Sequence, residues 1–123
     1  ARIEGPVTNE DEPVEVHIGG VGEPLDAVSI RDYEAAGELL RALSAPIRLA
    51  LVDLLSGGPR CVHELVDALG VSQPLVSQHL KSLRSVGLVS HERRGREILY
   101  SLADEHISHI TRDTLVHARE KHE

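Results

Sequence analysis

Aromatic residues are almost absent from this chain of 123 residues, which has two tyrosines and neither phenylalanine nor tryptophan. Its core must therefore be built from aliphatic side chains, which suits small packed helices. The single cysteine excludes a disulfide within one chain and indicates a reducing compartment. Apolar runs of about 18 residues are also missing, so we expect no membrane span, no signal peptide and a cytoplasmic location.

The net charge of −7 is unevenly distributed along a chain long enough for one compact domain. Residues 1–29 hold one Arg against seven Asp and Glu, a net of −6, and show no sustained hydrophobic period. We expect an acidic, largely disordered tail there, followed by a folded domain over residues 30–123. Within residues 72–100, five Lys and Arg face two Glu, a local +3, so the overall acidity does not exclude nucleic acid as a partner.

Hydrophobic periodicity predicts a mainly helical fold, with helices over residues 30–43, 47–55 and 62–69 and a fourth that begins after Ser72. Ser72 can cap this fourth helix, and Pro74 suits its first turn. A short turn that contains Gly70 joins the third and fourth helices, as in a helix-turn-helix. In that motif the second helix lies in the major groove of DNA.

Two short strands are expected over residues 88–92 and 97–102, with residues 93–96 as the turn and Gly95 at positive φ. A hairpin tipped with three Arg directly after a helix-turn-helix is typical of a wing that touches phosphates or the minor groove. The alternative is that these Arg only keep a sheet edge soluble. His79 either contacts phosphate or packs against the preceding helix. The candidate DNA contacts are Ser72, Gln73, Ser77, Gln78, His79, Lys81, Arg84, Arg93, Arg94 and Arg96.

The last helix combines an apolar stripe with four good zinc ligands in two pairs. Asp104 and His106 flank its start, while His117 and Glu120 are three residues apart and leave the same face. His106 and His117 are eleven residues apart, so at about 1.5 Å per residue they lie roughly 16 Å apart and cannot share one ion. The stripe consists of Ile107, Ile110, Thr114, Leu115 and Ala118.

An antiparallel second copy of this helix resolves the difficulty, because the front pair of one chain then meets the back pair of the other. Two identical tetrahedral sites result, each with two imidazoles and two carboxylates, which suit Zn²⁺ with Co²⁺ as a close mimic. The alternative is that these four residues simply form a solvated charged face.

Three segments resemble the ArsR/SmtB family of winged-helix, metal-sensing repressors. Residues 43–48 resemble the family's entry to its second helix, residues 75–80 its recognition helix, and residues 87–89 its exit into the wing. The pattern formed by Asp104, His106, His117 and Glu120 resembles the zinc-sensing subgroup. The resemblance covers about residues 30–122.

This resemblance implies a winged helix-turn-helix homodimer, joined through its first and last helices, with two zinc ions per dimer. It also implies that the metal-free dimer binds a palindromic double-stranded operator and that zinc weakens this binding. In the family, the ligand that matches His117 hydrogen-bonds a main-chain carbonyl, for which Gly87 is the corresponding position. Neither a membrane nor a small organic substrate is implied as a partner.

Cys61 lies in a segment where some members of the family bind soft metals. Cys61, Glu64 and His17 form a second, weaker candidate site; the alternatives are an inert buried cysteine and a redox-sensing one. Cobalt or nickel sensing, with His109 as an extra ligand, and a purely structural zinc also remain open. A metal-dependent hydrolase would need an open coordination position and a substrate cleft, so we expect no enzyme.

Overall fold

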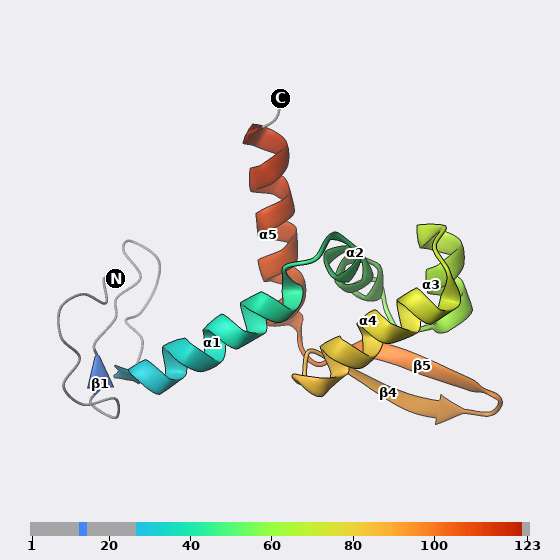
Figure 1. Ribbon diagram of the computed structural model, residues 1–123, viewed down its shortest axis with the longest axis horizontal. Helices are drawn as coiled ribbons and strands as arrows, with labels where there is room; N and C mark the ends of the chain where they lie inside the picture. The colour runs from blue at the N-terminus through green and yellow to red at the C-terminus, as the bar shows by residue number, and fades with distance from the viewer. Residues whose placement is uncertain (1–12, 15–26, 122–123) are drawn as a thin grey trace. The chain divides into compact units, whose positions relative to one another are not determined.

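The computed structural model describes residues 13–14 and 27–121, in two units that span residues 1–40 and 41–123 (Figure 1). In the first unit, β1 (Pro13–Val14) pairs antiparallel with β2 (Val28–Ser29). The helix α1 (Ile30–Leu43) begins directly after β2, and its bounds confirm the expected helix over residues 30–43. The rest of the acidic tail, including His17, lies outside the described residues, so its disorder stays a prediction.

The second unit contains the remaining helices and a three-stranded antiparallel sheet of order β3-β5-β4. The strand β3 was not expected, because two residues are too short to produce a sequence pattern. None of the helices in the described ranges is long and apolar enough to cross a membrane. The elements are α2 (Pro46–Leu55), β3 (Arg60–Cys61), α3 (Val62–Leu69), α4 (Gln73–Ser85), β4 (Val89–Arg94), β5 (Glu97–Leu102) and α5 (Glu105–Lys121).

The core of the second unit is aliphatic, as the composition predicts. Leu51 of α2, Leu65 of α3 and Leu80 of α4 are completely buried, and α2 packs against α3, α4, α5 and β5. Tyr100 is the one aromatic side chain in this core and remains 9% exposed. Because α2 is apolar on almost every face, it can serve as the central element that holds the other helices.

The helix-turn-helix is formed as expected by α3 and α4. Gly70 ends α3 with φ of 69°, a left-handed conformation that glycine adopts without steric cost. The side chain of Ser72 accepts a hydrogen bond from the backbone N–H of Leu75 at 3.4 Å, and Pro74 lies in the first turn of α4. The two helices pack against each other and against α2.

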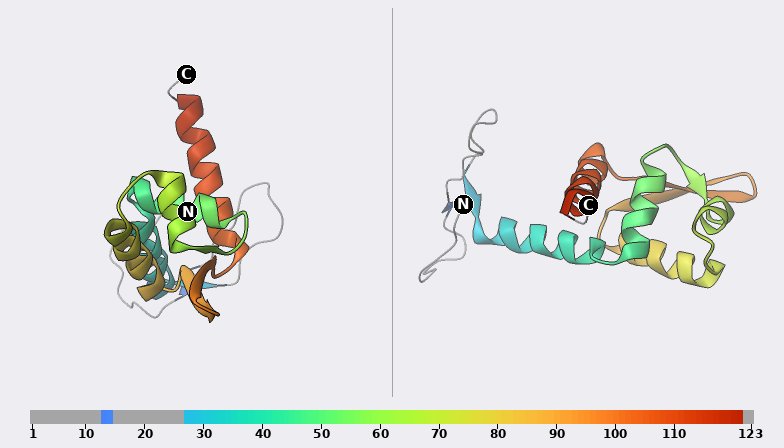
Figure 2. Two further views of the ribbon diagram at one scale, coloured as in Figure 1. Left: turned by 90° about the vertical axis from the view of Figure 1, so that its right-hand side faces the viewer. Right: turned by 90° about the horizontal axis from the view of Figure 1, so that it is seen from above.

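The hairpin of β4 and β5 has a tighter turn than the sequence predicted. Arg93 and Arg94 belong to β4, where they lie opposite Ile98 and Glu97, so the expected turn over residues 93–96 was wrong in its first half. Only Gly95 and Arg96 form the turn, with Gly95 at φ of 63°. A two-residue turn with a glycine at positive φ matches the strand twist, which allows pairing to continue to Arg94. Figure 2 shows this hairpin as an elongated arm beside the helices.

Candidate functional site

One face of α4 is anchored in the core and the other carries polar side chains. Val76, Leu80 and Leu83 are fully buried, which confirms most of the predicted stripe. Of the candidate DNA contacts on and beside α4, Ser72, Gln73, Gln78 and Lys81 are exposed, whereas Ser77, His79 and Arg84 are partly buried. The exposed face of α4 therefore carries several hydrogen-bond donors and the ammonium group of Lys81, while the opposite face is packed in the core.

His79 is held by an arginine of another helix. Nε of Arg48, in α2, donates to Nδ1 of His79 at 3.0 Å, and Nη1 of Arg48 donates to the carbonyl oxygen of Ala42 at 3.1 Å. The hydrogen bond of His79 is thus with α2 and not with the preceding helix α3 that the sequence suggested, and its contact with phosphate stays a prediction. Arg48 was not among the candidate site residues, although it lies in the motif of residues 43–48.

A second arginine joins α4 to the wing. Nη1 of Arg84 lies 3.1 Å from Nδ1 of His91, and the ring of His91 lies against Tyr100 with centroids 5.4 Å apart. Along the hairpin, Arg93, Arg94 and Arg96 are exposed, and Arg94 also pairs with Glu92 at 2.9 Å. The basic hairpin and α4 therefore form one connected surface.

At the start of α5, Asp104 and His106 are already spaced as two ligands of one metal ion. Oδ1 of Asp104 lies 3.2 Å from Nδ1 of His106 and also accepts the backbone N–H of His106 at 2.9 Å, which caps the helix. Ligand atoms of a tetrahedral zinc ion lie roughly 3.3 Å apart when each bond is about 2.05 Å long. The 3.2 Å spacing of these two atoms is therefore compatible with two ligands of one zinc ion.

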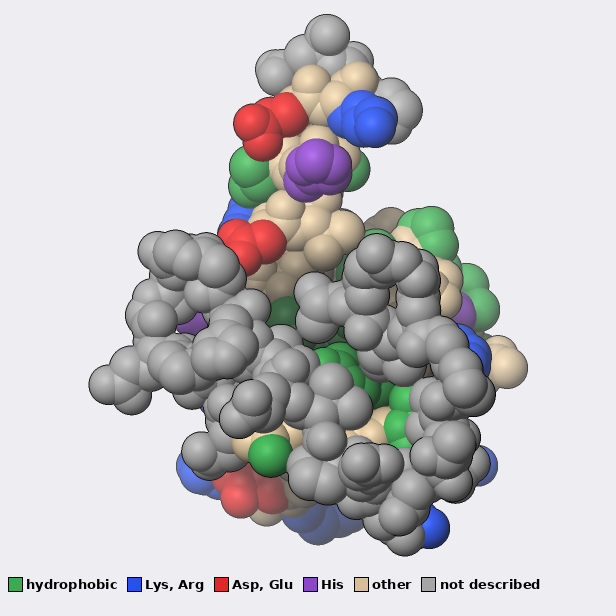
Figure 3. All heavy atoms as spheres, turned by 90° about the vertical axis from the view of Figure 1, so that its left-hand side faces the viewer, with side chains coloured by type: hydrophobic (Ala, Val, Ile, Leu, Met, Phe, Trp, Pro, Cys, Tyr) green, Lys and Arg blue, Asp and Glu red, His purple; other side chains and the backbone are tan. Residues whose placement is uncertain are grey.

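The second pair, His117 and Glu120, lies near the opposite end of α5 and is exposed. Within the described part of the chain, no third metal ligand lies close to Asp104 and His106. The single chain thus does not bring the two pairs together. Figure 3 shows acidic and histidine side chains on the exposed part of α5, where a partner could reach them.

Cys61 lies in a cluster that the sequence anticipated only in part. Its Sγ is 3.3 Å from a ring nitrogen of His63, and Cys61, His63 and Glu97 offer ligand atoms that all lie within 4.8 Å of one another. The thiol also donates to Oε1 of Glu64 at 3.2 Å. Glu97 was missed because only the pairing of β3 with β5 brings it beside Cys61. His17, the remaining predicted ligand, lies outside the described residues.

Two pKa values in this cluster are displaced. Burial raises the pKa of the Cys61 thiol, whose residue is only 4% exposed. The hydrogen bond from the backbone N–H of Cys61, at 3.0 Å, lowers the pKa of the Glu64 carboxyl. That carboxylate also closes a capping box at the start of α3. The two displaced pKa values favour a protonated Cys61 thiol beside an ionised Glu64 carboxylate.

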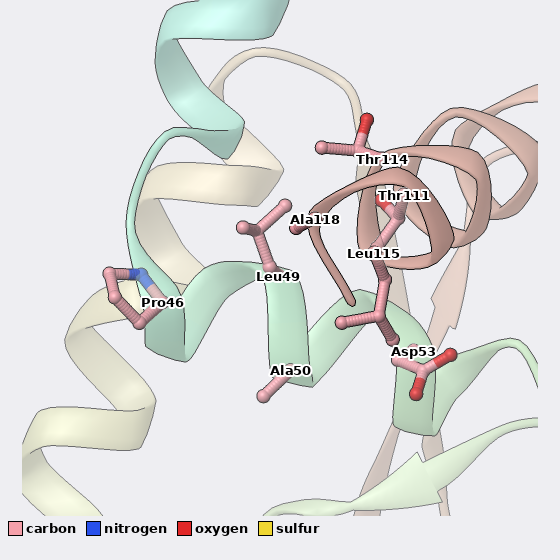
Figure 4. A pocket seen from close by; sticks show the side chains of 8 residues that line it. All are labelled: Pro46, Leu49, Ala50, Asp53, Thr111, Thr114, Leu115 and Ala118. Atoms are coloured by element: carbon pink, nitrogen blue, oxygen red, sulfur yellow. The ribbon is translucent and has the colours of Figure 1, made fainter. Parts of the chain in front are cut away.

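An apolar pocket of about 360 Å³ lies between α2 and α5 (Figure 4). Thr111 is 3% exposed, and its hydroxyl has no hydrogen-bond partner among the described residues. Arg112 and Asp53 form an ion pair at 2.8 Å between the same two helices. The lining residues are Pro46, Leu49, Ala50, Asp53, Thr111, Thr114, Leu115 and Ala118.

Much of the predicted apolar stripe of α5 remains uncovered. Ile107 is buried in the core, but Ile110 is 44% and Leu115 39% exposed, and the neighbouring Val116 is 46% exposed. Because an α-helix has 3.6 residues per turn, these three side chains point in different directions, and only Ile110 lies on the side of His106 and His117.

Comparison with known proteins agrees with the helix-turn-helix and the hairpin described above. The family model described as bacterial regulatory protein, arsR family, matches residues 45–91. The HTH-type transcriptional repressor SmtB of Mycobacterium tuberculosis is 63% identical over 87 residues, which cover 71% of this chain and 64% of that protein. A transcriptional repressor SmtB homolog of Synechocystis is 36% identical over 111 residues, which cover 89% of this chain and 83% of the relative.

A solved structure shares the fold. It is the homodimeric winged helix-turn-helix DNA-binding domain of a possible ArsR-family regulator from Mycobacterium bovis, with a TM-score of 0.64 and 31% identity over 72% of this chain and 82% of that one. The order α3, α4, β4, β5 reproduces the helix-turn-helix and wing that the sequence predicted. The chain therefore belongs to the ArsR family of bacterial regulatory proteins.

Proposed function

We propose that two copies of this chain form a transcriptional repressor that binds a palindromic operator without metal and releases it when zinc binds. The observation that carries the zinc part is the 3.2 Å spacing of Asp104 and His106 at the start of α5. Relatives named as SmtB repressors support the regulatory part. Membership of a family of regulatory proteins also agrees with our expectation that the chain is not an enzyme.

The dimer contact is expected along α5, together with α1. The exposed Ile110 lies four residues after His106 and seven before His117, so it shares their side of α5 and would be covered by the partner, which contributes favourable free energy of association. The related structure from M. bovis is described as homodimeric, which supports this arrangement. An antiparallel pair of α5 helices would bring Asp104 and His106 of one chain to His117 and Glu120 of the other.

DNA binding is assigned to α4 and the hairpin. Gln73, Gln78 and Lys81 are exposed on a helix whose opposite face is buried, as a helix entering the major groove requires. The exposed Arg93, Arg94 and Arg96 would reach phosphates or the minor groove beside it.

Zinc would act by changing the geometry of the dimer. In the metal-free dimer, Asp104 and Glu120 of opposite chains come together without a cation, and their repulsion opposes close approach of the two α5 helices. Bound zinc supplies the missing positive charge and joins the two chains. The α4 helices must keep a fixed spacing to enter successive major grooves, so zinc and operator favour different dimer geometries.

The test is fluorescence anisotropy of the metal-free protein on a palindromic operator, titrated with zinc. We expect release at about one zinc per chain. His117→Asn should still bind the operator but no longer release it, while Asp113→Asn at an exposed position of the same helix is the matched control. Operator binding by the wild type that ignores zinc would contradict the sensing mechanism and favour a structural zinc. Absence of operator binding would contradict the repressor assignment.

The cluster around Cys61 supports a second candidate, sensing of a metal ion that a thiolate helps to bind. Cys61, His63 and Glu97 are close enough to share one ion, with Glu64 and His17 as further candidate ligands. One thiolate, one imidazole and carboxylates suit zinc, cobalt or cadmium better than trivalent arsenic. Cobalt separates the two candidates, because only a site with Cys61 gives a thiolate-to-cobalt charge-transfer band. A band that Cys61→Ser abolishes, together with operator release, would favour this site as the sensor.

A further inference from the structure

Arg48 forms hydrogen bonds that connect α2 with α1 and with α4, the helix proposed to contact DNA. From α2 it donates one hydrogen bond to the carbonyl of Ala42, in the last turn of α1, and another to Nδ1 of His79, in the middle of α4. Both bonds are partly buried, at 3.1 and 3.0 Å. Leu80, the neighbour of His79, is completely buried, so the backbone on this side of α4 is well anchored.

The bond to Arg48 determines which nitrogen of His79 carries the proton. A guanidinium has donors only, so Nδ1 of His79 must be the acceptor. In a neutral imidazole one nitrogen accepts and the other carries the hydrogen, which places the proton on Nε2. Nε2 has no hydrogen-bond partner in the part of the chain that is described, and the residue is partly exposed. His79 therefore presents an oriented N–H donor that no described residue accepts.

We propose that Arg48 is a positioning residue that holds His79 as the Nε2–H tautomer, so that this N–H donates to a phosphate oxygen of the operator. The proposal rests on the assignment of α4 as the DNA-contacting helix. A ring fixed in tautomer and orientation loses less conformational entropy on binding than a free one. The contact uses a neutral donor, in contrast to the ammonium of Lys81 two residues later.

The first test observes the tautomer without DNA. Long-range ¹H–¹⁵N correlation spectra of the metal-free wild-type protein, recorded at a pH where the histidines are neutral, should give the Nε2–H pattern for His79. Arg48→Gln should convert it to a mixture of tautomers. His91 should keep its own pattern in the same variant, because Arg84 holds its Nδ1 independently. An Nδ1–H pattern in the wild type, or an unchanged His79 in the variant, would overturn the proposal.

The second test measures operator affinity by anisotropy, after circular dichroism and dimer mass confirm that each variant folds. His79→Asn, which lacks a donor at the Nε2 position, should weaken binding about tenfold per half-site. His79→Gln, whose amide nitrogen reaches that position, should recover part of the loss. Arg48→Gln should cost a smaller factor, because part of the His79 population keeps the Nε2–H tautomer, and should add little further loss in the double variant Arg48→Gln/His79→Asn. Additive losses, or equal affinities of the Asn and Gln variants, would refute the proposal.

Salt dependence separates this contact from a charged one. Lys81→Gln should reduce the slope of log K against log salt by about one per half-site, whereas His79→Asn should leave it unchanged at neutral histidine. A reduced slope for His79→Asn would mean that the ring binds as a cation, which contradicts the proposed tautomer. Failure of the wild type to bind operator would be a failure of the repressor assignment, and the tautomer measurement would remain valid.

Discussion

The sharpest consequence of the proposed zinc site is that two defective chains should repair each other. One variant, Asp104→Ala/His106→Ala, lacks the front pair, and the other, His117→Ala/Glu120→Ala, lacks the back pair. Each homodimer then has only incomplete sites, with two of the four ligands. In a mixed dimer, the intact back pair of the first variant meets the intact front pair of the second, which restores one complete site and leaves the other empty of ligands.

The expected stoichiometry follows from this geometry. The proposed arrangement gives the wild type about one zinc per chain, with two sites in each dimer. Random exchange of subunits gives mixed dimers half of the time, so the mixture should bind about a quarter of a zinc ion per chain. Each variant alone should bind none at this affinity when both carry Cys61→Ser, which removes the cluster around Cys61 as a source of zinc binding.

The assay is tight-binding zinc determined by competition with a chromogenic chelator, before and after the two variants are mixed and allowed to exchange. Native mass spectrometry of differently tagged chains provides the control, since it measures the fraction of mixed dimers directly. Mixed dimers that form but bind no zinc would refute the intermolecular site. So would either variant binding zinc as tightly as the wild type.

Three further predictions concern the fold and Cys61. Leu80→Ala should lower the free energy of unfolding by about 3 kcal/mol, because the side chain is completely buried. The control Val86→Ala, at a 37% exposed position, should lower it by less than about 0.5 kcal/mol. Urea unfolding at equal chain concentration measures both losses, and equal losses would contradict the assigned core. Glu64→Gln should lower the thermal midpoint of the metal-free protein at pH 7, but less and less as the pH falls below about 4, because the lowered pKa of Glu64 stabilises the fold only while the carboxyl is ionised. Asp67→Asn on the same helix is the control, and a difference that persists at pH 3 would disprove this assignment. Native Cys61 should react with iodoacetamide at least about tenfold more slowly than free cysteine at pH 7.5, because burial raises its thiol pKa, and a rate equal to that in urea would reopen a redox role.

Sequence patterns were sufficient for the elements that depend on local signals. Pro46, Ser72, Pro74 and Gly70 mark helix ends by backbone chemistry that acts within a few residues, and the helix bounds agree with them. The close approach of Asp104 and His106 was equally local, because the two residues lie within one turn. The predicted hairpin turn was two residues longer than the one observed. Its length depends on how far β4 and β5 remain paired, which the local sequence does not determine.

What the amino-acid sequence alone determined is therefore the family, the helix-turn-helix, the basic hairpin and the incompatibility of His106 and His117 with one ion in one chain. These follow from spacing and residue type, which are fixed by covalent order. Only the tertiary structure brought Glu97 beside Cys61 and Arg48 beside His79, because these pairs are 36 and 31 residues apart and meet through sheet pairing and helix packing. Contacts of that kind depend on how the whole core closes, which no local pattern encodes.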